Sequence, residues 1–136
     1  MSNVIVYGSM LLSMITSYAG MTADELGYYQ DLLKENSGYI TQRGDFVNIT
    51  IPIAELYEAK TTYMTAGSRQ LTSVLEVLIK QSTGKVYLNG RLNEDQDDLV
   101  FATSALYAQV SRLSEYLLSS LSDISYAPVR VEAYHK

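Results

Sequence analysis

The 136-residue sequence contains no cysteine and no tryptophan, and it has one histidine and two prolines. Without cysteine, disulfides and thiolate metal sites are excluded, and a single histidine excludes a metal site built from several histidines. Charged residues are also sparse, at 18% of the chain against about 25% in typical soluble domains. The balance is acidic, with a net charge of −5. The chain therefore lacks the clustered cations with which proteins bind nucleic acid.

Hydrophobic residues make up 47% of the chain, enough for a packed core, and the length fits a single domain spanning residues 1–136. We expect a mainly α-helical fold, with long N- and C-terminal helices that pack as a coiled coil or helical bundle around a small β-hairpin or strand patch. The expected segments are an apolar N-terminal helical segment (1–36), a central helix with short strands (37–95), a C-terminal heptad helix (96–126) and a tail (127–136).

The first 23 residues carry no charged side chain. The segment lacks the basic n-region of a signal peptide, so that interpretation is disfavoured. A membrane-spanning helix is also disfavoured, because Ser and Gly interrupt the apolar run and no cations flank it. We expect instead a helix buried against protein, because apolar residues follow the 3-4-3-4-3 spacing of a coiled-coil seam. That seam is Val4, Tyr7, Leu11, Met14, Tyr18 and Met21. Membrane contact by this helix is the less favoured alternative. The location stays open between the cytoplasm and export without cleavage.

Local signals divide the middle of the chain. Thr22 and Glu25 have the spacing of a capping box and predict a helix to about Asn36. Residues 46–51 are rich in β-branched side chains and predict a strand. A helix is expected from Pro52 to about Ser82, bent at Gly67. Asn89-Gly90 is a favoured type I′ turn dipeptide and predicts a β-hairpin over residues 85–93.

A long helix is predicted from Leu99 to about Tyr126, with acidic residues at 94–98 placed to interact with its positive end. Its heptad-spaced positions are Leu99, Thr103, Leu106, Val110, Leu113, Leu117, Ser120 and Ile124. Between its ends only three residues are charged, which is few for a helix facing solvent. The sequence therefore predicts that much of this helix is covered by protein.

No motif predicts catalysis or a cofactor. The one histidine, His135, is the penultimate residue, so a serine nucleophile has no positioned base, and we expect no enzyme activity. The acids near 94–98 lack the glycine and the final glutamate of a calcium loop. Arg43-Gly44-Asp45 spells an integrin-type tripeptide, although a glycine turn between two charged residues explains it as well, and whether it binds anything stays open.

The two long terminal helices with a small central part resemble the filament and needle-tip proteins of type III secretion systems. The resembling segments are Val4–Met21 and Leu99–Ile124, although this chain is shorter and continues past Pro128. The resemblance implies that the terminal helices pair as a coiled coil and line an assembly.

We expect a structural subunit of a homo-oligomeric filament or tube, whose partners are copies of itself and other assembly proteins. The alternative is a small helical adaptor or export chaperone that binds a partner helix. The expected self-association residues are Val4, Tyr7, Leu11, Leu12, Met14, Ile15, Tyr18, Leu106, Val110, Leu113 and Leu117.

Overall fold

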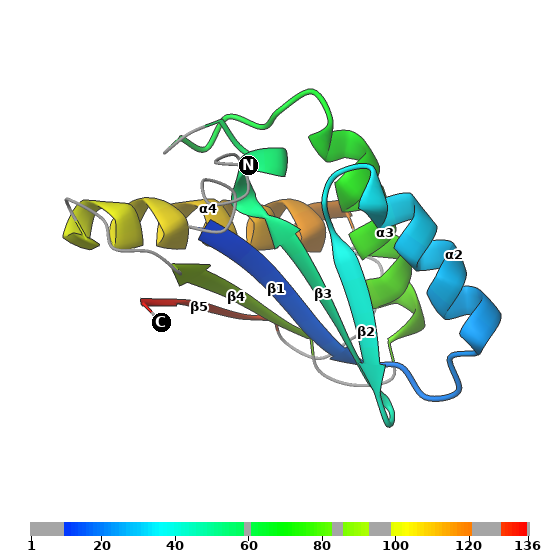
Figure 1. Ribbon diagram of the computed structural model, residues 1–136. Coiled ribbons are helices and arrows are strands. Elements are labelled where there is room, and N and C mark those ends of the chain that lie inside the picture. The colour runs from blue at the N-terminus through cyan, green and yellow to red at the C-terminus, as the bar shows by residue number, and fades with distance from the viewer. Residues whose placement is uncertain (1–9, 59–60, 83–85, 93–98, 121–128, 136) are drawn as a thin grey trace.

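The computed structural model describes residues 10–58, 61–82, 86–92, 99–120 and 129–135 (Figure 1). These residues form both strands and helices. In chain order they are β1 (Met10–Ser17), α2 (Ala23–Lys34), β2 (Tyr39–Arg43), β3 (Phe46–Pro52), the 3-10 helix η1 (Ile53–Glu55), α3 (Ser68–Gln81), β4 (Val86–Leu92), α4 (Leu99–Ser120) and β5 (Val129–His135).

The strands form one five-stranded sheet in the order β2-β3-β1-β4-β5. Neighbours from β2 to β4 are antiparallel, and β5 lies parallel to β4. The part from β1 to β4 has the connectivity of a split β-α-β arrangement, also called ferredoxin-like. Helix α4 then supplies the long crossover that a parallel neighbour of β4 requires. Strand β1 is therefore the central strand and pairs on both sides.

The three α-helices cover one face of the sheet, and the core lies between these two layers (Figure 1). Alternate residues of the central strands point into this core, as the period of two along a strand requires. Across the sheet, Leu12 pairs with Ile51 and Gly90, and Met14 pairs with Ile49 and Leu88. The helices contribute the apolar side chains that cover them, among them Leu33, Leu71, Leu75, Leu78, Leu106, Val110 and Leu113, all fully buried.

The expectation of a mainly helical coiled-coil protein is wrong, because the chain forms an α/β sheet structure. The central difference is residues 10–17, which form strand β1 rather than part of a long N-terminal helix. A short apolar run fits a buried strand as well as a buried helix, and its partners decide between them. Here β3 and β4 pair with both edges of the run. The coiled-coil basis for a filament or secretion role is therefore lost.

Two predictions for the middle of the chain are also wrong. Asn89-Gly90 lies inside strand β4 rather than in a hairpin turn, because Gly90 lies against helix α4, where a Cβ atom would come within 2.7 Å of Leu106 Cγ. The predicted helix from 52 to 82 is limited to the short η1 and to α3. Between them Tyr57 forms a β-bridge with Met64, and Gly67 is the N-cap of α3 rather than a bend.

Other predictions are confirmed. The capping box is present, with Thr22 accepting from the Glu25 backbone N–H and the Glu25 carboxylate accepting from the Thr22 N–H. The predicted strand at 46–51 is β3, and the C-terminal helix is α4. Its heptad positions Leu106 and Leu113 are buried as expected, but against the chain's own sheet. None of the described helices combines the length and hydropathy needed to span a membrane.

Candidate interaction surfaces

Most of the residues predicted to mediate self-association lie inside the chain's own core. On strand β1 and just after it these are Leu12, Met14 and Tyr18, and on α4 they are Leu106, Val110, Leu113 and Leu117, none more than 5% exposed. Leu11 and Ile15 differ, since they occupy the alternate positions of β1 and are only partly buried. Val4 and Tyr7 lie outside the described residues. Of the nine predicted residues that the structure describes, only Leu11 and Ile15 are placed where a partner can reach them.

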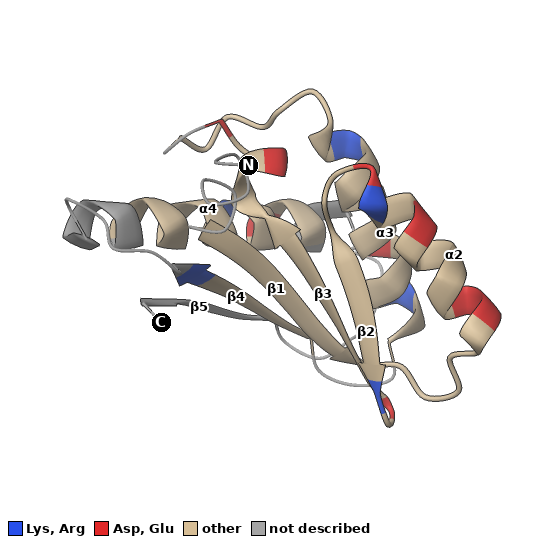
Figure 2. Cartoon of the chain, in the orientation of Figure 1, with Lys and Arg blue, Asp and Glu red and all other residues tan. Residues whose placement is uncertain are grey.

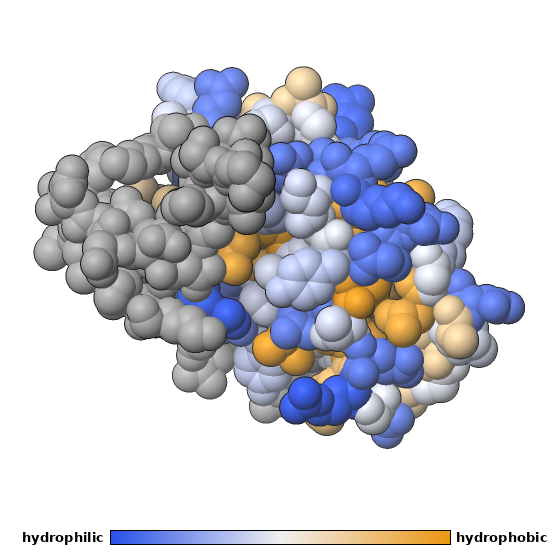
Figure 3. Space-filling view, viewed as in Figure 1, coloured by the Kyte–Doolittle hydropathy of each residue, from blue (hydrophilic) through white to orange (hydrophobic). Residues whose placement is uncertain are grey.

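The outer face of the sheet, opposite the helices, has few charges. We define this outer face by the alternate positions of β1 to β4, which are Leu11, Ser13, Ile15, Ser17, Tyr39, Thr41, Arg43, Phe46, Asn48, Thr50, Pro52, Tyr87, Asn89 and Arg91. The charges among them are two arginines, Arg43 near one end and Arg91 near the other. Figure 2 shows that other charges lie on α2, on α3, at the β2–β3 turn, around η1 and on α4. Apolar side chains are exposed between polar ones on this face (Figure 3).

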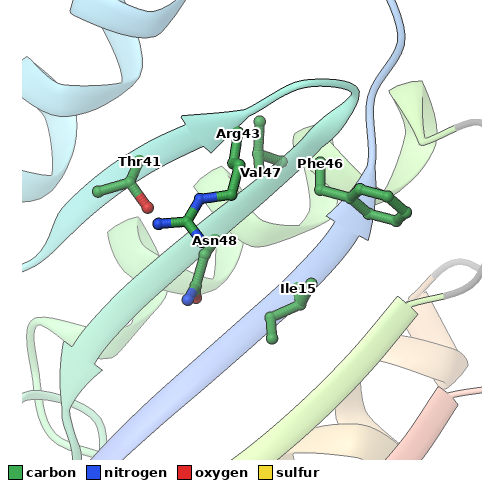
Figure 4. A pocket seen from close by; sticks show the side chains of 6 residues that line it. All are labelled: Ile15, Thr41, Arg43, Phe46, Val47 and Asn48. Carbon is green, nitrogen blue, oxygen red and sulfur yellow. The ribbon is translucent and has the colours of Figure 1, made fainter.

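A hollow of about 280 Å³ lies on the outer face where β1, β3 and β2 meet. Figure 4 shows its lining, with the Arg43 side chain extending between Thr41 and Asn48 and Ile15 on the neighbouring strand. Asn48 is held in place because its Oδ1 accepts a hydrogen bond of 2.8 Å from the Ser13 hydroxyl. Phe46 borders the hollow and is 57% exposed. The hollow therefore combines a guanidinium, an amide and an exposed ring.

The Arg43-Gly44-Asp45 tripeptide forms the exposed turn between β2 and β3, next to this hollow. Gly44 has φ of +61°, which a glycine adopts without strain. The backbone carbonyl of Asp45 accepts a hydrogen bond of 2.7 Å from the Tyr18 N–H. Arg43, Gly44 and Asp45 therefore have a structural role in the β2–β3 hairpin. This role explains the tripeptide without a ligand.

A second surface is an apolar hollow of about 230 Å³ between α2 and α3, called here the α2–α3 groove. Tyr28 and Tyr29 border it from α2, with their rings edge to face at 5.5 Å, and Val74 and Val77 border it from α3. Tyr28 is 61% exposed and Val77 is 43% exposed. Two large apolar side chains are thus left uncovered at one place on the helical layer.

An acidic stripe runs beside the groove. Asp24, Tyr28, Asp31 and Glu35 are all exposed and follow a 4-3-4 spacing, which places them on one side of α2 and its C-cap. Helix α2 carries one cation, Lys34, in its last turn. The α3 residues Gln70, Ser73 and Val77 on the opposite rim are uncharged. The groove therefore has an uncharged lining, and the acidic residues lie beyond its α2 rim.

The outer edge of β2 is covered in part by a side chain of α2. The Gln30 Oε1 accepts a hydrogen bond of 3.0 Å from the Ile40 N–H, and the Gln30 Nε2 donates to the Gly38 carbonyl over 3.4 Å. One amide side chain thus takes the place of a neighbouring strand at residues 38 and 40. Unpaired edges invite pairing with other chains, so Gln30 protects this one.

The described residues include few side chains whose pKa is shifted from its ordinary value. They contain no cluster of three or more His, Cys, Asp or Glu side chains that would hold a metal ion. Their strongly perturbed groups are tyrosines in separate places, since burial raises the pKa of Tyr18 to about 12 and that of Tyr57 to about 12. The buried Tyr57 hydroxyl and Gln109 Oε1 have no hydrogen-bond partner among the described residues. Neither lies on the outer face or in the α2–α3 groove.

Of the residues that make these two surfaces, the predicted self-association set contains Leu11 and Ile15, and most of the others were not predicted. Arg43 and Phe46 pair within the β2–β3 hairpin, and Ile15 joins them only because β1 pairs with β3. The groove joins Tyr28 to Val77, which are far apart in the chain. If residues 10–17 are treated as a strand with a period of two, Leu11 and Ile15 fall on one face and Leu12 and Met14 on the other. This alternation is the one sequence feature that predicts part of the outer face.

Comparison with protein-family models, with curated proteins and with solved structures finds no match to this chain. The geometry of the two surfaces is therefore the basis for assigning a function.

Proposed function

We propose that this protein is a non-catalytic subunit that associates with copies of itself through the outer face of its sheet. The observation that carries the proposal is the composition of that face, on which β1 and β3 bear no charged residue while Phe46 is 57% exposed. Large exposed apolar patches on a soluble domain mark sites of interaction. The proposal keeps the predicted self-association and moves it from a helical seam to a sheet face.

The chemistry of this face favours a protein partner. Interface cores are depleted in charged residues and enriched in aromatic ones, and burying an unpaired charge is costly. Phe46, Tyr39 and Tyr87 supply rings on the outer face, and Ser13 and Asn48 already satisfy each other by a hydrogen bond. Ser13, Thr50 and Asn89 in the middle of the face are already buried within the chain. A partner would therefore cover mainly Phe46 and Tyr39, with little desolvation of charge.

The test is the molar mass of the purified chain, measured by sedimentation velocity and light scattering over a wide range of concentrations. We expect the wild-type chain to form oligomers and Phe46→Glu to weaken them by at least tenfold in dissociation constant. The matched control is Tyr107→Glu, because Tyr107 is 52% exposed but lies on α4. A wild-type chain that stays monomeric, or a control variant that fails as badly as Phe46→Glu, would contradict the proposal.

The second candidate is an adaptor that holds a partner's helix in the α2–α3 groove. Its support is the uncovered apolar pair Tyr28 and Val77, since an amphipathic helix lays its apolar side chains into such a groove. An adaptor predicts that the isolated chain is monomeric and that Val77→Glu abolishes partner binding. Self-association predicts an oligomer without any partner, so the mass measurement separates the two functions.

A further inference from the structure

We infer that the self-association is head to tail, with the outer face of one copy seated on the α2–α3 groove of the next. This inference rests on the proposed function and adds the identity of the second surface. It commits the groove to one occupant, which is the sheet of another copy. Three features of the described residues support it: the layer structure, the distribution of charge and the size of the groove.

The layer structure leaves two surfaces that complete each other. Each copy has helices on one face of its sheet, and no described helix covers the other face (Figure 1). Sheets covered by helices on both faces are a common stable architecture. When α2 and α3 of one copy lie on the outer face of another, they supply that missing layer. The apolar side chains that both surfaces expose are then buried in one contact.

The distribution of charge selects this pairing over the contact of two sheet faces. The outer face of β1 to β4 carries Arg43 and Arg91 and no carboxylate, because Asp45 lies in the turn beyond these strands. Two such faces brought together would find no carboxylate on β1 to β4, and the acidic residue that continues the face in register is Glu132, which pairs with Asn89 from β5. The acidic stripe of Asp24, Asp31 and Glu35 beside the groove offers the two arginines acidic partners. Opposite potentials on two surfaces favour their encounter and fix their orientation.

The size of the groove suits one side chain rather than a small molecule. Its volume of about 230 Å³ lies below the roughly 300–1,000 Å³ of ligand pockets. Phe46 stands at the edge of the outer face, directly opposite Arg43 in the β2–β3 register. With Phe46 seated between Tyr28 and Val77, the inferred contact is oriented so that Arg43, its partner on β2, faces the acidic stripe of α2. Aromatic and arginine side chains are the usual energetic centres of such contacts.

The test uses two variants of the full chain that each remove one surface. Phe46→Glu removes the sheet-face surface, and Val77→Glu removes the groove. Each variant keeps the other surface intact. We expect each variant alone to be monomeric, while an equimolar mixture forms a dimer and nothing larger. The mixture is rescued only in a head-to-tail contact, because one copy then contributes the intact groove and the other contributes the intact Phe46. Two copies joined through the same surface gain nothing from mixing.

Each outcome is read by sedimentation velocity, with circular dichroism and thermal unfolding confirming that both variants are folded. Both substituted side chains are exposed, and Tyr28→Glu is a second groove variant if Val77→Glu does not fold. An oligomeric wild type whose mixture stays monomeric would overturn the head-to-tail contact and leave the proposed function standing. A Val77→Glu variant that associates like the wild type would also overturn it and return the groove to a partner helix. A monomeric wild type would overturn both proposals.

Discussion

The Tyr18 hydroxyl donates a hydrogen bond of 3.0 Å to the Glu25 Oε2, and this contact ties the end of the central strand to the start of α2. The other carboxylate oxygen, Oε1, accepts the Thr22 N–H at 2.9 Å in the capping box. The same hydroxyl also lies 3.0 Å from the Gln81 Oε1 at the end of α3. One carboxylate therefore caps a helix and joins the sheet to the helical layer.

The first prediction concerns acid. The Thr22 backbone N–H, and then the Tyr18 hydroxyl, hold the pKa of Glu25 below its ordinary value of 4.5. A folded pKa below the unfolded one means that the stabilisation is present above about pH 4.5 and is lost as the pH falls through the folded value. We expect the urea midpoint of the wild type to fall toward that of Glu25→Gln in this window. A gap between the two proteins that stays constant from pH 7 to strong acid would contradict the prediction.

The second prediction compares two buried tyrosines. Tyr57→Phe removes a hydroxyl that has no partner among the described residues, and we expect the protein to be as stable or more stable by about 1 kcal/mol, because an unsatisfied buried group is costly. Tyr18→Phe removes a hydroxyl bonded to Glu25, and we expect a loss of about 1 kcal/mol. Urea unfolding of both variants decides it. Equal losses would show that the Tyr57 hydroxyl has a partner after all.

The same two side chains give a third prediction in alkali. Burial raises the pKa of Tyr18 to about 12, with the hydrogen bond and charge of Glu25 adding to it, and burial raises the pKa of Tyr57 to about 12. A raised pKa means that the stabilisation is complete below the unfolded value near 10 and is lost as the pH rises through the folded value. We expect tyrosinate absorbance to grow in two stages, with the late stage reduced in Tyr18→Phe. Titration of all tyrosines together near pH 10 in the folded chain would contradict this.

The features predicted correctly from the sequence are those that depend on residues close together in the chain. The capping box needs only Thr22 and Glu25, three residues apart, and it is present as predicted. The apolar face of α4 is equally local, and Leu106, Val110 and Leu113 are buried. A 3.6-residue period identifies a buried helix face but not the surface that covers it. The covering surface is a sheet, so the predicted coiled coil is wrong.

The errors occur where distant segments decide the structure. Residues 10–17 become a strand because β3 and β4 pair with both edges, and their apolar spacing happens to fit a helical seam as well. Asn89-Gly90 has turn chemistry, but α4 packs so closely over it that a glycine is needed in the strand. The outer face and the groove are further examples, since each joins residues from separate segments. No local pattern contains such information.

The fourth prediction tests that account of Gly90. A Cβ atom there would lie 2.7 Å from Leu106 Cγ and 2.9 Å from Val110 Cγ2. We expect Gly90→Ala to lower the free energy of unfolding by about 1–3 kcal/mol, because a packed core resists an added methyl group. The matched control is Gly27→Ala on α2, where nothing lies within 4 Å and better helix propensity raises stability by up to about 1 kcal/mol. An unchanged midpoint for Gly90→Ala would show that α4 does not pack against β4 in this way.

The fifth prediction concerns the protected edge of β2. Gln30→Ala removes both hydrogen bonds that cover residues 38 and 40. We expect the Ile40 amide to exchange with solvent much faster and the unfolding free energy to fall by about 1–2 kcal/mol, since a backbone donor loses its partner. Asp31→Ala, an exposed neighbour on the same helix, is the control and should leave the Ile40 exchange rate unchanged. Because an uncovered edge pairs with other chains, Gln30→Ala should also aggregate sooner on heating than the control. Slow Ile40 exchange in Gln30→Ala would show that another group protects this edge, and the amide side chain would then be incidental.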